Sequence, residues 1–127
     1  MFRSILVIII SYLVGSIPFG LIIGRLWAKI DVREYGSGNI GTSNVLRTVG
    51  PWAAITVFAL DVAKGAAAVY LATLAGADYV RILAGVAAIV GHNWPIYLRF
   101  RGGKGIATSL GVVITLTPVV ALMLLGL

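Results

Sequence analysis

The sequence predicts an all-α protein, a polytopic transmembrane helix bundle of about four spans with its N-terminus outside. Of its 127 residues, 60% are hydrophobic and only 11% are charged, which is too apolar for a soluble domain of this size. The apolar residues form runs comparable with the roughly 20 residues that cross a bilayer. None of these runs alternates with period 2 as a half-buried strand does. We therefore expect one transmembrane domain over residues 1–127.

Four uncharged or nearly uncharged runs define the expected spans. They cover residues 4–24, 52–75, 82–98 and 106–127, with polar links at 25–51 and 99–105. Arg3 precedes the first run, as in a signal peptide, but this run exceeds a typical signal-peptide core and no clear cleavage site follows it. We expect Pro18, Pro95 and Pro118 to kink their spans, because neighbouring helices can satisfy the carbonyl groups that a proline frees.

Small residues recur at every fourth position in three of the runs. They are Ser16, Gly20 and Gly24 in the first run, Ala68, Ala72 and Gly76 in the second, and Ala84 and Ala88 in the third. Small faces of this kind let helix backbones approach closely in a membrane, although Gly and Ala are also common in membrane helices generally. The pattern favours a compact bundle without a wide aqueous pore.

The positive charge lies mostly in the two polar links. Arg25, Lys29, Arg33 and Arg47 belong to the first link, and Arg99, Arg101 and Lys104 to the second. Only Arg3 and Arg81 lie toward the opposite ends of the spans. Because cytoplasmic loops collect Lys and Arg, both links are expected to face the cytoplasm side by side. In an apolar chain, the net charge of +6 points to anionic lipid and phosphorylated ligands before nucleic acid.

The first link carries glycines in the spacing G-x-G-x-x-G. They are Gly36, Gly38 and Gly41. A dinucleotide site would need a preceding strand, and an apolar run stands there instead. The glycines can still expose backbone N–H groups, and Thr42 or Ser43 can cap a short helix, so the segment is a candidate anion cradle. Arg47 can add a bidentate phosphate contact. The alternative is a flexible glycine-rich connector.

The second link again joins glycines to cations. Lys104 stands where the fourth run begins, and an ammonium beside the free N–H groups of a helix start suits a phosphate. The segment is not a Walker A loop, because Gly105 follows Lys104 and no strand precedes it. Arg99 and Arg101 alternate with aromatic residues, so anchoring at the membrane interface is their favoured role.

The remaining polar residues offer little conventional catalytic chemistry. The chain has no cysteine, which excludes thiolate nucleophiles and cysteine metal sites. A single histidine, His92, makes no convincing metal site, and a structural role for it is favoured over catalysis. Asp61 and Lys64 lie three residues apart inside a span, so they should pair or face the bundle interior. A structural ion pair and a pair that supports a site remain equally open.

Two long segments carry a resemblance to a known family. GSGNIGTSNVLRTVG (36–50) and GHNWPIYLRFRGGKGIATSLG (91–111) resemble the first two signature loops of the bacterial membrane-integral acyl-phosphate:glycerol-3-phosphate acyltransferases. DVAKG (61–65) resembles another recurrent segment of that family. The resemblance implies transfer of a fatty acyl group from acyl-phosphate to the first hydroxyl of glycerol 3-phosphate. The products are lysophosphatidate and phosphate, in the first step of phospholipid synthesis.

The same resemblance implies where the protein works and with what. It places the chain as a multi-pass protein of the bacterial cytoplasmic (inner) membrane, with its active loops facing the cytoplasm. The implied partners are the two substrates, the bilayer and the soluble enzyme that makes acyl-phosphate, with no nucleic acid, cofactor or metal. Family members extend further, with a third signature loop, whereas this sequence ends at Leu127 inside an apolar run. We therefore expect the sequence to be part of a longer protein.

Residues and resemblance together give an expected site. The catalytic residues are Ser37, Arg47 and Lys104; the substrate-binding residues are Gly36, Gly38, Asn39, Gly41, Thr42, Asn44, His92, Gly102, Gly103 and Gly105; the supporting residues are Asp61 and Lys64. Because acyl-phosphate is already activated, positioning and charge stabilisation suffice. No residue of the sequence stands out as the base for the attacking hydroxyl, and the resemblance implies that a substrate phosphate can serve. We expect the acyl tail to leave sideways between the spans. The competing class is a small non-enzymatic transporter or channel subunit, which inverted repeats would favour. The sequence shows no such repeats.

Overall fold

The computed structural model describes residues 1–75, 78–117 and 126. Its elements are α1 (Phe2–Gly15), α2 (Phe19–Ile23), the π-helical turn η1 (Gly24–Ala28), the 3-10 turn η2 (Val32–Glu34), α3 (Thr42–Thr48), α4 (Pro51–Thr73), α5 (Asp78–Asn93), the 3-10 turn η3 (Ile96–Leu98) and α6 (Ile106–Leu116). The described residues contain no strand. The all-α prediction is confirmed.

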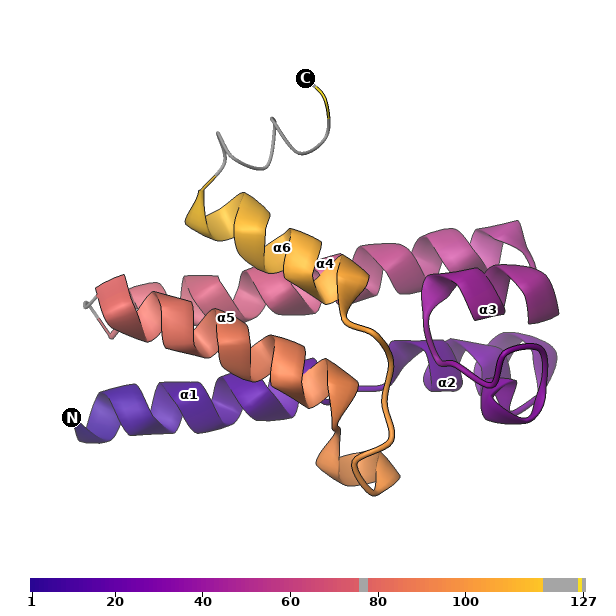
Figure 1. Ribbon diagram of the computed structural model, residues 1–127, viewed down its shortest axis with the longest axis horizontal. Helices are drawn as coiled ribbons and strands as arrows, with labels where there is room; N and C mark the ends of the chain where they lie inside the picture. The colour runs from indigo at the N-terminus through magenta and orange to yellow at the C-terminus, as the bar shows by residue number, and fades with distance from the viewer. Residues whose placement is uncertain (76–77, 118–125, 127) are drawn as a thin grey trace.

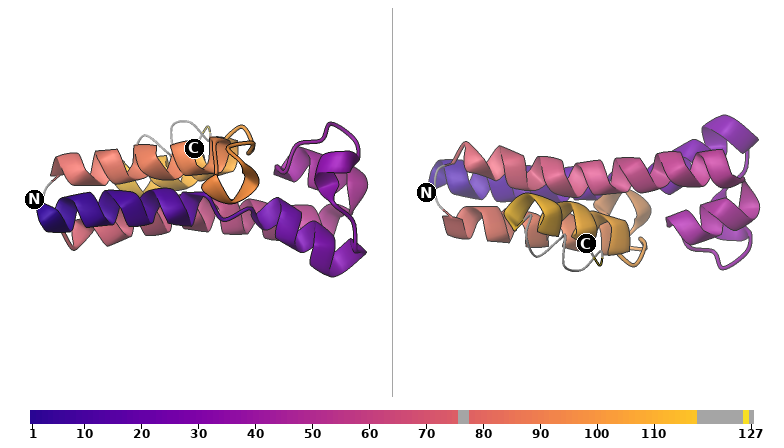
Figure 2. Two further views of the ribbon diagram at one scale, coloured as in Figure 1. Left: turned by 90° about the horizontal axis from the view of Figure 1, so that it is seen from below. Right: turned by 90° about the horizontal axis from the view of Figure 1, so that it is seen from above.

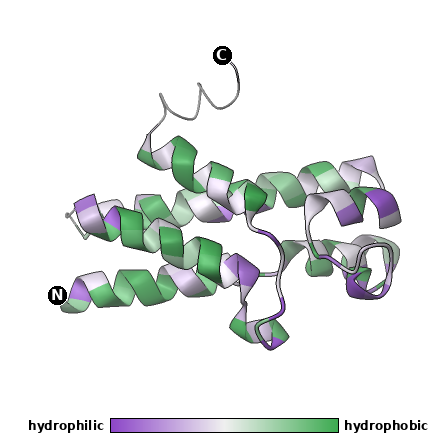
Figure 3. Cartoon of the chain, viewed as in Figure 1, coloured by the Kyte–Doolittle hydropathy of each residue, from purple (hydrophilic) through white to green (hydrophobic). Residues whose placement is uncertain are grey.

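The long helices form a bundle with both polar links toward one end. Helices α1, α4 and α5 run side by side, and α6 packs along α4 (Figures 1 and 2). The N-terminus lies at the far end of the bundle, and α3 folds back against the first part of α4 (Figure 1). The expectation that the two links are neighbours is therefore confirmed. Colouring by hydropathy shows apolar helices and polar links (Figure 3).

The bundle presents apolar side chains on its outside. Ile9 on α1, Ile55 and Tyr70 on α4, and Val86 on α5 are all exposed, as lipid-facing residues would be. Two helical stretches, Phe2–Ala28 and Pro51–Thr73, are long and apolar enough to cross a membrane, and Ile106–Leu116 is a shorter apolar helix. Inside, a cluster that includes Val32, Ile40, Val45 and Val57 fixes the first link to α2 and α4.

The prolines act differently from one another. Pro18 interrupts the first apolar run as expected, since α1 ends at Gly15 and α2 begins at Phe19. The predicted kink at Pro95 is wrong, because α5 already ends at Asn93 and Pro95 starts a 3-10 turn. A proline removes a backbone N–H and disfavours helix in the residue before it, so it ends this helix rather than bending it. Pro118 lies outside the described residues.

The small residues produce close backbone contacts, only partly where expected. Ala68, Ala72, Ala84 and Ala88 are fully buried between helices, whereas Gly76 lies outside the described residues. Gly20 and Gly24 were expected to contact another span, and this expectation is wrong. A Cβ on Gly20 would overlap the Ile40 backbone and one on Gly24 the Val32 side chain, so both admit the first link rather than another span.

Two further glycines set the α4–α6 crossing. A Cβ on Gly65 would overlap the carbonyl oxygen of Thr108, and one on Gly111 would overlap that of Val62. Glycine at both positions therefore lets the two backbones touch, which places the start of α6 beside the middle of α4.

Candidate functional site

Asn44 organises the first link from its buried position in the short helix α3. Its Nδ2 lies 2.9 Å from the Val32 carbonyl oxygen, 3.1 Å from that of Tyr35 and 2.8 Å from that of Asn39. Its Oδ1 accepts a hydrogen bond of 3.0 Å from the Ser37 N–H. One side chain therefore ties the ends of the loop to the helix that follows it.

The loop's own amides are largely occupied, which corrects the expected glycine cradle. The Gly38 N–H donates to the Tyr35 carbonyl, the Asn39 N–H to Ser37 Oγ, and the Gly41 N–H to Asn39 Oδ1. Gly36 and Gly38 take positive φ angles of 56° and 77°, so they make the turn possible instead of presenting N–H groups to an anion.

The predicted N-cap is also wrong. Helix α3 is capped by Gly41, and no side chain of Thr42 or Ser43 makes the capping bond. The Asn39 side chain instead accepts from the Gly41 N–H, which fixes the residue that enters the helix. The side chains of Thr42 and Ser43 face the second link instead.

The second link is docked onto the end of α5 by its glycines. The Gly102 N–H donates to the Asn93 carbonyl and the Gly103 N–H to the His92 carbonyl, both at 3.0 Å. A Cβ on Gly103 would collide with the His92 ring, and one on Gly105 would press on Asn93 Oδ1. Lys104 is thus carried between two glycines that fit tightly against α5, just before α6 begins.

Buried charged groups lie where α1, α4 and α5 meet. Lys64 Nζ lies 3.0 Å from Asp61 Oδ1, 2.7 Å from His92 Nδ1 and 3.0 Å from the Ile17 carbonyl oxygen. The Asp61 contact is an ion pair without hydrogen-bond alignment. All three side chains are 5% exposed or less. The expected Asp61–Lys64 pair is confirmed, and it also binds His92, which the sequence did not indicate.

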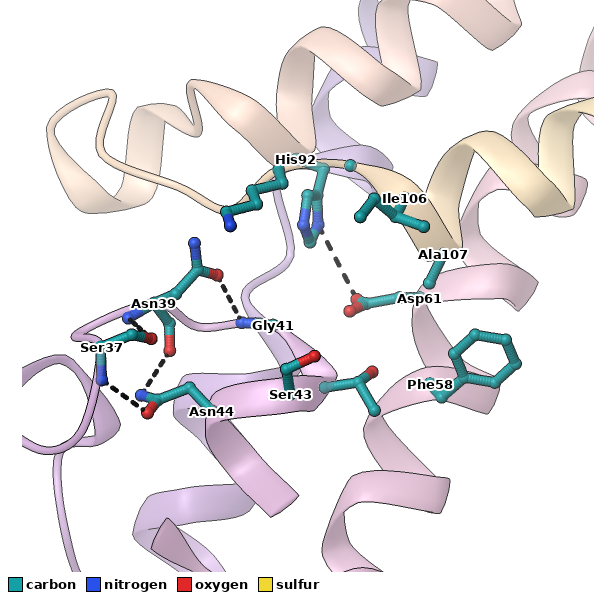
Figure 4. A pocket seen from close by; sticks show the side chains of 13 residues that line it. Ser37, Asn39, Gly41, Ser43, Asn44, Phe58, Asp61, His92, Ile106 and Ala107 are labelled. Carbon is teal, nitrogen blue, oxygen red and sulfur yellow. Dashed lines mark hydrogen bonds and ion pairs between the residues drawn. The ribbon is translucent and has the colours of Figure 1, made fainter. Parts of the chain in front are cut away.

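A cavity of about 310 Å³ lies between the two links. It is lined by Ser37, Asn39, Gly41, Thr42, Ser43, Asn44, Phe58, Asp61, His92, Lys104, Gly105, Ile106 and Ala107 (Figure 4). Its walls combine a cation, a histidine and several hydroxyl and amide groups with apolar side chains, as ligand pockets usually do. In the described ranges no three side chains of His, Asp or Glu converge as a metal site would require.

The cavity collects most, but not all, of the residues expected at the site. Among the catalytic candidates, Ser37 and Lys104 line it, whereas Arg47 does not. Arg47 is exposed on α3, with the stem of its side chain against Gly36. Gly36, Gly38, Gly102 and Gly103 also lie outside the lining, and Lys64 reaches it only through Asp61 and His92.

Three lining residues were not singled out from the sequence. Phe58 lies one helical turn before Asp61 on α4, and Ile106 and Ala107 open α6. Their positions follow from the α4–α6 crossing at Gly65, which no sequence pattern marked. The first turn of α6 also has N–H groups without intrahelical partners, so its positive end adjoins the cavity beside Lys104.

A second cavity, of about 390 Å³, also lies between the two links. It is lined by Asp31, Arg33, Glu34, Gly38, Ile40, Arg101 and Gly102. Arg33 donates to both carboxylate oxygens of Asp31, and this guanidinium holds the pKa of Asp31 well below its usual 3.8. Asp31 Oδ1 also accepts from the Arg33 N–H, so the pair caps the turn η2.

The chain matches known proteins over nearly its whole length. The family model described as glycerol-3-phosphate acyltransferase matches residues 5–127. A glycerol-3-phosphate acyltransferase of Thermoanaerobacter pseudethanolicus is 49% identical over 98% of this chain, and one of Prochlorococcus marinus is 47% identical over 98%. The chain spans 63% and 64% of the length of these two relatives.

The same family appears among solved structures. The crystal structure of PlsY (YgiH), an integral membrane glycerol 3-phosphate acyltransferase, in its glycerol 3-phosphate form is 40% identical, with a TM-score of 0.88. The match covers 94% of this chain and 60% of the chain in that crystal structure. The lysophosphatidic acid form gives a TM-score of 0.85 at 39% identity. This chain is an integral membrane protein that belongs to the glycerol-3-phosphate acyltransferase family.

Proposed function

We propose that this chain supplies two of the loops with which a membrane enzyme acylates glycerol 3-phosphate. Acyl-phosphate is the proposed donor. The first hydroxyl of glycerol 3-phosphate attacks the acyl carbonyl carbon, the carbonyl–phosphate bond breaks, and lysophosphatidate and inorganic phosphate are formed. The observation that carries the proposal is the cavity that joins Ser37, Asn39 and Asn44 to His92 and Lys104. The family relatives supply the substrate class.

The proposed chemistry needs positioning and charge stabilisation instead of a protein nucleophile. Lys104 has no acidic partner within hydrogen-bonding distance in the described part of the chain, so its ammonium is available to a phosphate. The start of α6 adds the positive end of a helix on the same side. Together they can hold a phosphate group while the carbonyl carbon is attacked.

Ser37 is proposed to orient the reacting end of a substrate. Its Oγ accepts a hydrogen bond of 3.3 Å from the Asn39 N–H, so the hydroxyl hydrogen stays free to donate into the cavity. Arg47 is proposed as the contact for the second phosphate. This role requires its exposed side chain to move from Gly36 toward the cavity, because in the present conformation it lies outside the lining.

We further propose the membrane arrangement that the charge pattern predicts. Both links face the cytoplasm of a bacterial inner membrane, the N-terminus faces outside, and the four apolar runs cross the bilayer. Acyl-phosphate then enters from the membrane, with its tail beside Phe58 and Ile106 at the apolar side of the cavity. The soluble enzyme that makes acyl-phosphate would deliver it to this face.

The test is an acyl-transfer assay on the longest gene product that contains this chain, purified in detergent. Acyl-phosphate and radiolabelled glycerol 3-phosphate should give labelled lysophosphatidate, whereas acyl-CoA in place of acyl-phosphate should not. Absence of product with acyl-phosphate would refute the enzyme proposal and favour a phosphate-binding transporter or channel subunit.

Lys104→Ala tests the site itself. Loss of one charge-assisted hydrogen bond to phosphate costs about 1.5–3 kcal/mol, which lowers kcat/KM about 10- to 150-fold. Arg3→Ala is the matched control, because it removes an exposed cation at the opposite end of the bundle and should leave the rate unchanged. A normal kcat/KM in Lys104→Ala would contradict the assignment of this residue.

A further inference from the structure

The buried Lys64 ammonium is held by acceptors from three parts of the chain. The break after α1 provides the Ile17 carbonyl oxygen at 3.0 Å, α4 provides Asp61 Oδ1 at 3.0 Å, and α5 provides His92 Nδ1 at 2.7 Å. An ammonium has three N–H donors and no acceptor. Each donor therefore has one nearby acceptor, and the Asp61 carboxylate supplies the opposite charge that burial of Lys64 demands.

This arrangement determines which nitrogen of His92 carries the proton. Nδ1 faces an ammonium that can only donate, so Nδ1 must be the acceptor and lack a hydrogen. In a neutral imidazole the hydrogen then sits on Nε2. The opposite tautomer would set the Nδ1–H against a Lys64 N–H, two donors facing each other without an acceptor between them.

The other side of the His92 ring faces the second link and the cavity. A Cβ on Gly103 would collide with Nε2, which shows that this nitrogen lies directly beneath the glycine that precedes Lys104. Nε2 has no hydrogen-bond partner among the described residues, and His92 lines the cavity opposite the first link (Figure 4). A donor placed there can reach an anionic group that Lys104 also contacts.

We infer that Lys64 is a positioning residue that locks His92 as a neutral Nε2–H donor toward a phosphate oxygen of the substrate in the cavity. The phosphate class of the ligand rests on the proposed function, whereas the tautomer does not. His92 in this state has no lone pair at Nε2, so it binds and orients substrate and is not the general base. Buried Lys64 thereby influences the reaction without touching either substrate.

The first experiment observes the tautomer directly. ¹⁵N-histidine labelling of the protein in detergent micelles, with any affinity tag removed, reports the ring nitrogens of His92, whose resonances are those missing from the spectrum of His92→Gln. At neutral pH we expect a proton-bearing Nε2 and an unprotonated Nδ1. A proton on Nδ1, with or without one on Nε2, would overturn the inference. This measurement needs no turnover.

Variants then test the role of Lys64. Asp61→Asn with Lys64→Met removes the donor without leaving a lone buried carboxylate, and should give a mixture of both tautomers. Lys104→Met is the matched control, which removes a cation at the cavity and should keep the wild-type pattern because the Lys64–Asp61 pair still faces Nδ1. A single Nε2–H tautomer in the double variant would show that Lys64 does not fix the ring.

Ligand titration and kinetics test the donor. Glycerol 3-phosphate, and separately inorganic phosphate, should shift the Nε2–H resonance, and unchanged resonances with both would refute donation to a phosphate. In an active enzyme, His92→Gln keeps an N–H near the Nε2 position and His92→Asn does not. We expect His92→Asn to raise KM for glycerol 3-phosphate at least about fivefold above that of His92→Gln. If no lysophosphatidate forms but the tautomer is as expected, the proposed function fails and the role of Lys64 stands.

Discussion

Asn44 allows the organisation of the first link to be tested with a nearly isosteric change. In Asn44→Asp, one carboxylate oxygen can still accept from the Ser37 N–H. The other replaces the amide nitrogen and faces the carbonyl oxygens of Val32, Tyr35 and Asn39 at 2.9, 3.1 and 2.8 Å. Two N–H donors are lost, and a negative charge is placed among acceptors in a site where Asn44 is only 2% exposed.

The expected cost follows from those contacts. At about 0.5–1.5 kcal/mol for each of two hydrogen bonds, the link loses about 1–3 kcal/mol, and charge repulsion adds to this. Local opening then becomes about 5- to 150-fold more frequent. Hydrogen exchange measured by mass spectrometry should therefore accelerate by that factor in peptides from 31–41, while peptides from the middle of α4 keep their protection.

Asn39→Asp is the matched control for this experiment. Asn39 uses its Oδ1 to accept from the Gly41 N–H at 2.8 Å, and a carboxylate can make the same bond. The same chemical change should therefore leave exchange in the link near the wild-type rate. Wild-type exchange in Asn44→Asp, or equal acceleration in both variants, would refute the assignment of Asn44 as organiser of the link.

Further predictions concern packing and pH. Gly65→Leu should lower the apparent melting temperature in detergent, because its Cβ would overlap the Thr108 carbonyl oxygen and overpacking costs about 1–3 kcal/mol. Ala67→Leu, on the exposed face of α4, is the control and should leave the melting temperature unchanged. A melting temperature of Gly65→Leu equal to that of the wild type would contradict the close α4–α6 crossing. Because Arg33 lowers the pKa of folded Asp31, their pair stabilises the first link above the unfolded pKa near 3.8 and loses this effect as pH falls toward the folded value. Any difference in melting temperature between wild type and Asp31→Asn should be nearly constant from pH 5 to 8, because that window begins about one pH unit above the unfolded pKa near 3.8. The difference should narrow below pH 4, and a difference that widens there would contradict the lowered pKa of folded Asp31.

The sequence predicted those features of the fold that follow directly from the polarity of the residues. Long uncharged runs predicted the helices, and charges too costly to leave alone in a span predicted the Asp61–Lys64 pair. It was less informative about which acceptor each backbone N–H group of the links binds. Glycines in the first link suggested free N–H groups, but Ser37 Oγ, Asn39 Oδ1 and Asn44 Oδ1 take them up. These bonds depend on turn geometry that the spacing of glycines does not specify.

The predicted boundaries show the same limit. An apolar run continues past Asn93, yet the helix ends there because Pro95 follows and the glycines of the second link bind the freed carbonyls of His92 and Asn93. Hydropathy registers only whether residues suit lipid. It carries no information about a helix end that is fixed by hydrogen bonds from a segment ten residues later.

The break in the first apolar run connects packing to chemistry. In a continuous helix the Ile17 carbonyl would accept from the Leu21 N–H, but α2 starts at Phe19 and leaves part of that acceptor capacity free. Lys64 binds this carbonyl, and the same ammonium binds His92. Between apolar helices in lipid there is little hydrophobic drive for association, so close contacts and polar bonds must hold them. The contacts that join α1, α4 and α5 are therefore the contacts that orient His92 at the cavity. A change that loosens this junction should disturb the proposed phosphate binding in the cavity before it unfolds the bundle.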